Sequence, residues 1–337
     1  MHSAFIAGCA GVELTPDEFS FFRDKRPAGF ILFERNCANP DQLKALVEGV
    51  RDALQTDAVF IAIDQEGGRV QRLVPPHWQQ YPAAMDLAKL ADEDNDAGMD
   101  ALRLVNRAIA ADLMALGINM NCTPVLDLPV EGAHAIIGNR AYGYDVEAIA
   151  ARARVVADAH LECGVLPVIK HIPGHGRSTK DSHKALPVVD ATRQSLEETD
   201  FLPFKLLNDL PVAMTAHIVY SDIDDGEPAS TSSTVIREVI REHIGFGGLL
   251  MSDDLSMHAL EGSMASRTRD VLGAGCDLAL HCNGDLGEMR EVAENALELT
   301  GTGLERFNKA LLQRTSGLVG PKAEDAEKLA ALLAQIG

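Results

Sequence analysis

The sequence is short of positive charge: its 337 residues include 30 Lys and Arg against 50 Asp and Glu, which gives a net charge of −20. A surface this acidic repels polyphosphate and anionic lipid headgroups, so we expect neither nucleic-acid binding nor docking on membranes. No apolar run approaches the roughly 18 residues of a membrane span. The first residues, 1–8, contain no Lys or Arg and do not resemble a signal peptide.

Closely spaced cysteine pairs are also missing. The six cysteines include no C-x-x-C pair, and most of them lie in apolar, strand-like context. This distribution is typical of buried free thiols in a reducing cytosol and argues against a disulfide framework or a zinc knot. We therefore expect a cytoplasmic protein.

Short apolar runs typical of strands alternate with longer amphipathic stretches typical of helices. Strands are expected at 4–7, 29–33, 59–64, 118–127, 165–171, 212–219, 248–253 and 277–282. Helices are expected at about 40–54, 96–116, 145–162, 194–208, 233–243, 263–274 and 285–299. The first connection, residues 8–28, gives no clear signal.

This alternation implies parallel strands, and eight units imply closure into a barrel. An open doubly wound sheet is the rival, but the G-x-G-x-x-G motif that often follows its first strand is absent. Single (β/α)₈ barrels typically run about 250 residues and can exceed 400, so the length fits one domain. We predict an α/β protein: a single (β/α)₈ TIM-type barrel over 1–337, with extra helices at about 303–336 divided near Gly317 to Pro321.

Ionisable residues stand at or near the carboxyl ends of most of these strands. They are Asp64, Asp127, Lys170, His171, His217, Asp253, Asp254 and His281. In a barrel these ends meet at one mouth, where the active sites of barrel enzymes lie. Because a buried charge is costly unless it is paired or functional, the pattern predicts an enzyme.

The segment after the fifth strand, K-H-I-P-G-H-G-R-S-T-K-D-S-H over 170–183, is too rich in Pro and Gly for a helix and is expected to be a mobile loop at the mouth. Asp181 and His183 are two residues apart, so in an extended segment the carboxylate can orient the imidazole for proton transfer. The alternative is a solvated loop in which neither acts. A metal site formed with His171 and His175 is a further alternative, although the H-x-H of metal-dependent barrel hydrolases is missing from the first strand.

Two further strand ends carry acids. Asp64 precedes a Gly-Gly pair that allows a ligand to approach the backbone closely, and an Asp that accepts from vicinal hydroxyls suits a sugar; an Asx-turn is the alternative. Glu66 is either a second carboxylate or a partner for a nearby Arg. Asp253 is expected at the mouth as a glycosidase nucleophile or a general base, with Asp254 turned away to cap the next segment.

Three strings, D-Q-E-G-G-R-V from Asp64, K-H-x-P-G-H-G followed by D-S-H, and S-D-D-L-S-M from Ser252, together resemble glycoside hydrolase family 3. More narrowly, they resemble the bacterial β-N-acetylhexosaminidases of cell-wall recycling, the NagZ type, over roughly residues 4–300. The K-H-x-P-G-H-G…D-S-H string separates this branch from the β-glucosidases of the family. Ile172 stands where the branch often has Phe, a mild apolar exchange.

The resemblance implies a (β/α)₈ barrel and retaining hydrolysis of a terminal β-linked N-acetylglucosamine. It implies that Asp253 is the nucleophile, that a covalent glycosyl–enzyme forms, and that His183 is the acid/base, tuned by Asp181. The sugar-binding positions that it implies are Asp64, Arg72, Arg140, Lys170 and His171. It further implies GlcNAc-anhydroMurNAc-peptides as substrates, in peptidoglycan recycling, and neither a metal nor an organic cofactor.

Alternative functions remain at this point. Because a His acid/base places no carboxylate against an incoming anion, phosphate can replace water and give a β-N-acetylglucosaminide phosphorylase on the same scaffold. A metal-dependent barrel hydrolase and a sugar-binding barrel without turnover are the others. The expected assembly is a monomer.

Overall fold

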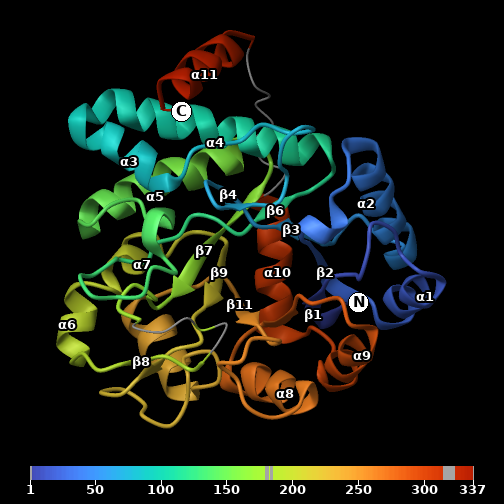
Figure 1. The fold of residues 1–337 in the computed structure, drawn as a ribbon. Helices are drawn as coiled ribbons and strands as arrows, with labels where there is room; N and C mark the ends of the chain where they lie inside the picture. The colour runs from blue at the N-terminus through green and yellow to red at the C-terminus, as the bar shows by residue number, and fades with distance from the viewer. Residues whose placement is uncertain (1, 179–181, 183–184, 314–322, 337) are drawn as a thin grey trace.

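The computed structural model of the chain describes residues 2–178, 182, 185–313 and 323–336 (Figure 1). Eight parallel strands close into a barrel, because the first strand pairs with both the second and the last. In order around the barrel the strands are β1 (Ser3–Ala7), β2 (Pro27–Leu32), β3 (Phe60–Ile63), β6 (Met120–Asn121), β7 (Leu166–Ile172), β9 (Val212–Thr215), β11 (Leu249–Asp254) and β12 (Leu278–His281). The predicted TIM-type barrel is confirmed.

Helices lie around this barrel and over one of its ends (Figure 1). They are α1 (Pro16–Lys25), α2 (Pro40–Leu54), α3 (Ala84–Glu93), α4 (Asn95–Ala115), α5 (Val146–Glu162), α6 (Arg193–Glu198), α7 (Leu202–Leu206), a π-helix (Val235–His243), α8 (Met264–Ala274), α9 (Leu286–Asn295), α10 (Gly301–Gln313) and α11 (Ala323–Ile336). Side-chain caps fix where several of these helices begin. Asn39, the residue before α2, accepts a hydrogen bond through its side-chain oxygen from the N–H of Gln42 in the first turn, and Pro40 is the first residue of that helix. No described helix is long and apolar enough to cross a membrane.

Some elements differ from the prediction. The strand predicted over 118–127 ends after Asn121. Pro124 lies three residues further on and has no N–H to donate to a neighbouring strand. The helix predicted over 194–208 divides into α6 and α7. The first connection contains α1, which begins with a capping box between Thr15 and Glu18. The expected division of the tail between Gly317 and Pro321 lies outside the described residues.

Helix α3 was not predicted, nor was the hairpin of β4 (Gln65–Gly67) and β5 (Val70–Gln71), which stands at the barrel mouth. The small parallel pair of β8 (Val188–Val189) and β10 (Val219–Tyr220) was also not predicted as a sheet of its own. The predicted sixth strand runs into β10, so its second half leaves the barrel.

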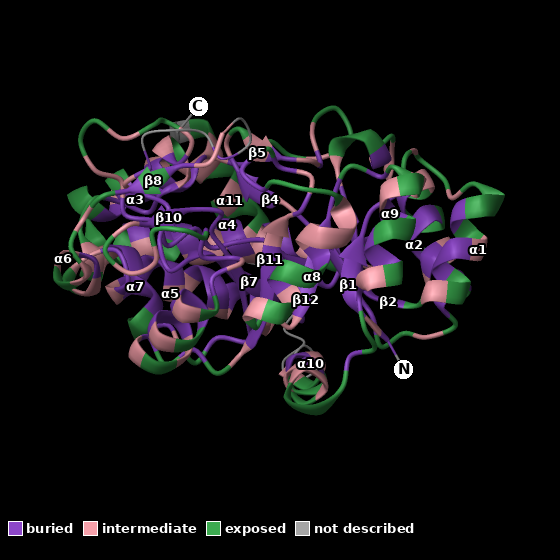
Figure 2. Ribbon diagram, turned by 90° about the horizontal axis from the view of Figure 1, so that it is seen from below, coloured by how far each residue is buried: buried purple, intermediate pink, exposed green. Residues whose placement is uncertain are grey.

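The buried apolar side chains form two main clusters, one between the strands and the surrounding helices and one inside the barrel. The inner cluster includes Phe307 and Ala310 of α10, and the Phe307 ring packs against Phe60 of β3 with 4.7 Å between centroids. Figure 2 shows α10 at one edge of the molecule and the β4–β5 hairpin at the opposite edge. Helix α10 therefore closes the amino-terminal end of the barrel and leaves the carboxyl end for a site.

Candidate active site

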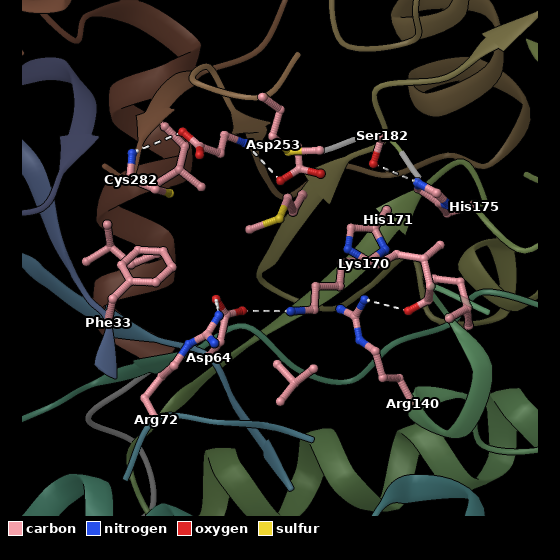
Figure 3. A pocket seen from close by; sticks show the side chains of 18 of the residues that line it. Phe33, Asp64, Arg72, Arg140, Lys170, His171, His175, Ser182, Asp253 and Cys282 are labelled. Atoms are coloured by element: carbon pink, nitrogen blue, oxygen red, sulfur yellow. Dashed lines mark hydrogen bonds and ion pairs between the residues drawn. The ribbon is translucent and has the colours of Figure 1, made fainter. Parts of the chain in front are cut away.

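A pocket of about 310 Å³ lies at the carboxyl ends of the strands (Figure 3). Its polar lining consists of Asp64, Arg69, Arg72, Arg140, Lys170, His171, His175, Ser182, Asp253 and Asp254. Its apolar lining consists of Ile31, Phe33, Val70, Ile136, Ile137, Met214, Met257, Leu280 and Cys282. Every described residue among the predicted sugar-binding and catalytic positions therefore lies around one cavity.

Asp64 follows β3 and is held by two cations. Its Oδ1 lies 2.8 Å from Nζ of Lys170 on β7, and its Oδ2 lies 3.0 Å from Nη2 of Arg72. Burial by itself would raise the pKa of the Asp64 carboxyl, but Lys170 and Arg72 outweigh burial and hold that pKa well below its ordinary value. Asp64 is therefore ionised at neutral pH, and it keeps lone pairs for ligand hydroxyls.

Glu66 lies on β4 and forms a bidentate pair with Arg140, with both N···O distances at 2.8 Å. Its Oε1 is also 2.6 Å from Nζ of Lys170. The Glu66 and Lys170 side chains are almost completely buried. Of the two roles considered for Glu66, the structure shows the pairing with an Arg, and this pair fixes the guanidinium of Arg140 at the pocket wall.

Asp127, which follows β6, is fully buried and organises the start of the loop after β7. Its Oδ2 is 2.7 Å from Nδ1 of His171, and its Oδ1 accepts from the backbone N–H groups of His171 and His175 at 3.1 and 2.7 Å. Burial would raise the pKa of Asp127, but His171 and His175 together outweigh burial and hold that pKa below its ordinary value. The carboxylate thus orients the His171 ring toward the pocket that this ring lines.

Asp253 and Asp254 end β11 and differ in what they do. The Asp253 carboxylate lines the pocket, and its Oδ1 accepts from the Asp254 N–H at 2.8 Å. The Asp254 carboxylate turns to the next segment, where it accepts from the Ser256 and Cys282 N–H groups, each at 3.0 Å, and from the Ser256 hydroxyl. Figure 3 shows Asp253 on one side of the pocket and Asp64, Arg72 and Lys170 on the other.

Several wall residues carried no signal in the sequence. The Phe33 ring, at the end of β2, has the guanidinium groups of Arg35 and Arg72 at 5.0 and 5.1 Å from its centroid. Arg69, at the tip of the β4–β5 hairpin, donates to the carbonyls of Ala135 and Ile136 and so holds the loop that brings Ile136 and Ile137 to the pocket. These residues lie in connections, and only tertiary contacts bring them to the mouth.

The two remaining strand-end histidines point to structural partners. His217 shares hydrogen bonds with the Ser230 hydroxyl at 2.7 Å and the Asp254 carbonyl at 3.1 Å. His281 lies 3.0 Å from Glu288. Both are completely buried and neither lines the pocket.

The predicted acid/base pair, Asp181 and His183, lies outside the described residues; Ser182 between them is described. The metal alternative combined these two residues with His171 and His175, which are described. In the described part of the chain, no group of three or more His, Cys, Asp or Glu is placed to hold a metal ion.

Comparison with known proteins identifies the family. The sequence profile of the glycosyl hydrolase family 3 N-terminal domain matches residues 12–311. The chain belongs to glycoside hydrolase family 3. It is 37% identical over 278 residues to the beta-hexosaminidase of Bordetella parapertussis, covering 81% of this chain and 78% of that protein. It is 38% identical over 283 residues to the beta-hexosaminidase of Neisseria gonorrhoeae, covering 82% and 77%.

Solved family 3 structures have the same fold. NagZ from Neisseria gonorrhoeae, solved with N-trifluoroacetyl-D-glucosamine, superposes with a TM-score of 0.89 at 30% identity, covering 100% of this chain and 98% of that one. A β-N-acetylglucosaminidase of the family from Paenibacillus sp. FPU-7 gives a TM-score of 0.86 at 27% identity, covering 98% and 66%. The predictions of a family 3 glycoside hydrolase and of its β-N-acetylhexosaminidase branch are confirmed.

Proposed function

We propose that the protein is a retaining exo-β-N-acetylglucosaminidase that releases terminal β-linked N-acetylglucosamine from GlcNAc-anhydroMurNAc-peptides in peptidoglycan recycling. One observation carries the catalytic part: the Asp253 carboxylate, at the end of β11, lines the same pocket as the Asp64–Lys170–Arg72 cluster. The similarity to a NagZ solved with an N-acylglucosamine analogue supports the sugar. The recycling role rests on the resemblance of the three sequence strings to the cell-wall recycling branch.

Asp253 is proposed as the nucleophile that attacks the anomeric carbon. Its Oδ1 is oriented by the Asp254 N–H. Across the pocket, the cations Lys170, Arg72 and Arg140 are paired with the carboxylates of Asp64 and Glu66. Attack on the anomeric carbon uses the ionised form of Asp253. The covalent glycosyl–Asp253 that forms is then hydrolysed, so configuration is retained.

Recognition of the sugar is proposed to rest on five polar residues. Asp64 accepts from ring hydroxyls, while Lys170, Arg72, Arg140 and His171 donate. Such charge-assisted hydrogen bonds are about twice as strong as neutral ones and fix one orientation of the ring. The apolar lining, which includes Phe33 and Met257, offers apolar surface to the carbon-bearing face of the sugar.

Proton transfer is assigned to His183, with Asp181 as its partner. Most retaining glycosidases use two carboxylates, and a His with an unperturbed pKa of about 6.5 is a departure. Such a group gives a proton to the leaving oxygen and then takes one from water near neutral pH without strong desolvation. The proposed chemistry requires neither a metal nor an organic cofactor.

We also propose that the chain is a single catalytic barrel domain that works as a monomer in the bacterial cytoplasm. All six cysteines are free, which suits a reducing compartment. Size-exclusion chromatography and cell fractionation test assembly and location.

The deciding assay compares p-nitrophenyl β-N-acetylglucosaminide with the β-glucoside, with and without EDTA and in phosphate buffer. We expect a strong, chelator-insensitive preference for the N-acetyl sugar and free N-acetylglucosamine as product. Asp253→Asn should abolish turnover and retain binding of N-acetylglucosamine, and Asp181→Asn should slow both half-reactions. Loss of activity with EDTA, a sugar 1-phosphate product, or normal turnover by Asp253→Asn would each contradict the proposal.

A further inference from the structure

The loop after β7 is tied to the barrel at a point that the mechanism above does not use. The His175 and Ser182 side chains are both about 2% exposed and both line the pocket. Nε2 of His175 shares a hydrogen bond of 3.1 Å with the Ser182 hydroxyl, drawn as a dashed line in Figure 3. This contact links residue 175 to residue 182 across the loop.

His175 is itself rigidly held. Its backbone N–H donates to Asp127, the same carboxylate that orients His171, and its ring meets the His171 ring edge-on with 5.4 Å between centroids. Burial and the neighbouring His171 lower the pKa of His175 to about 4. The ring is thus neutral at neutral pH, so it acts toward Ser182 as a hydrogen-bonding group and not as a charge.

The groups around His175 come from four segments of the chain. Asp127 lies on the segment after β6, His171 on β7 and Ser182 on the loop, and Asp253 on β11 contributes a weaker electrostatic effect. These contacts restrain the backbone and the ring of His175. A neutral, buried ring that bonds the Ser182 hydroxyl, on a backbone held by a fixed carboxylate, is suited to holding the loop in place.

We propose that His175 is a positioning residue that, through Ser182, supports the proton transfer assigned to Asp181 and His183. Ser182 is bonded directly to Asp181 and His183 in the chain, and consecutive Cα atoms are about 3.8 Å apart. Anchoring Ser182 therefore restrains the residue to which both proposed groups are bonded. This inference rests on the proposed roles of Asp181 and His183.

The test compares leaving groups. p-Nitrophenolate departs with little protonation, whereas the sugar hydroxyl released from N,N′-diacetylchitobiose needs an acid. We would measure kcat/KM for both substrates in His175→Ala, Ser182→Ala and the double variant, with His183→Ala as the benchmark. The backbone N–H of residue 175 remains to bond Asp127 in each variant, and thermal unfolding verifies that each is folded.

Tyr220→Phe is the matched control. The Tyr220 hydroxyl donates to the Gly174 carbonyl in the same loop, so its loss loosens the loop at a different point. A general loosening would slow the two substrates equally, whereas a misplaced acid slows the one that needs protonation.

We expect kcat/KM for the disaccharide to fall about 100-fold in His175→Ala and in Ser182→Ala, with a loss of about tenfold or less for the p-nitrophenyl substrate. The double variant should be no worse than either single variant, because both remove one contact. The high-pH limb of kcat/KM, which reports the acid, should move in the same direction as in Asp181→Asn.

Equal losses on both substrates, or losses that add in the double variant, would overturn the positioning role of His175. If His183→Ala still shows the leaving-group dependence, the proposed acid/base stands and only the positioning role falls. If His183→Ala shows no such dependence, the proposed acid/base is wrong and this inference falls with it. A leaving-group dependence in Tyr220→Phe as large as that in His175→Ala would also overturn the positioning role.

Discussion

At the residue level, the buried charges at the barrel mouth depend on one another. Lys170 lies within 2.8 Å of both Asp64 and Glu66, and Glu66 also holds Arg140. Removing one partner of such a group leaves an uncompensated buried charge. The same contacts that set the geometry for a ligand therefore also stabilise the fold.

Replacement of Glu66 by Gln should lower the free energy of unfolding by about 3 kcal/mol, because Arg140 and Lys170 lose a shared carboxylate in a buried setting. Urea unfolding of the wild type and the variant at neutral pH measures this difference in the free energy of unfolding. The matched control is Glu288→Gln, which breaks a 39%-exposed contact to His281 and should cost at most about 1 kcal/mol. Similar losses in the two variants would contradict this account of the cluster.

The residues predicted from the sequence were those whose position in a strand already implied the mouth. Asp64, Lys170 and Asp253 stand at strand ends, and parallel closure brings strand ends together. Phe33 also follows a strand, but an aromatic residue there is equally typical of a core. Arg69 depends on the hairpin turn, which no sequence period indicated.

Among the elements, the loop after β7 packs unusually close to the segment after β6. A Cβ added at Gly176 would lie 1.7 Å from the Leu128 carbonyl oxygen. Gly176→Ala should therefore displace the loop and lower kcat by about 100-fold while costing about 1–3 kcal/mol of stability. Gly49→Ala, in α2 where an added Cβ meets nothing within 4 Å, should keep full activity and gain up to about 1 kcal/mol. Full activity in Gly176→Ala would contradict the packing.

Helix α10 contributes stability from the end of the barrel opposite the site. Phe307 is 1% exposed and packs on Phe60, so Phe307→Ala should cost about 3–5 kcal/mol. Its kcat at a temperature where it is folded should be unchanged, since it does not line the pocket. Leu312→Ala on the same helix, where Leu312 is 70% exposed, should cost less than about 0.5 kcal/mol. Comparable losses would show that α10 does not close the barrel.

The eight barrel strands could be predicted from the sequence, whereas some breaks between elements could not. Each of the eight strands was predicted from a short apolar run, because a strand between the barrel interior and the surrounding helices is apolar on both faces. The break between α6 and α7 and the departure of β10 from the barrel have no periodic signal. They are decided by contacts with distant segments, such as the pairing of β10 with β8.

For the whole molecule, acid should weaken the fold partly through the pocket. The pKa values of Asp64, Glu66 and Asp127 are lower than ordinary in the folded protein, because their partners outweigh burial. Their stabilisation is fully present above the unfolded pKa of about 4 and is lost as pH falls through the folded values. The stability gap between wild type and Glu66→Gln should thus shrink below about pH 4. Comparing the two proteins cancels the effect of the net charge of −20. A gap that widens in acid would contradict the assigned direction.

At the same scale, the number of strand–helix units was enough to predict the closed barrel and to place a site at one end of it. The volume and wall of the pocket could not be predicted, because they depend on how the connections fold over the mouth. The hairpin with Arg69 and the loop with Ile136 and Ile137 form part of that wall.

The central claim is that Asp253 forms a covalent bond to the sugar. A 5-fluoro-N-acetylglucosaminyl fluoride should trap that intermediate, and trypsin should release residues 242–267 as one peptide containing Asp253 and Asp254. We predict that this peptide gains the mass of one fluorosugar, that fragmentation places it on Asp253, and that Asp253→Asn gains none. A label on any other residue, or turnover of the fluoride without any label, would contradict the account.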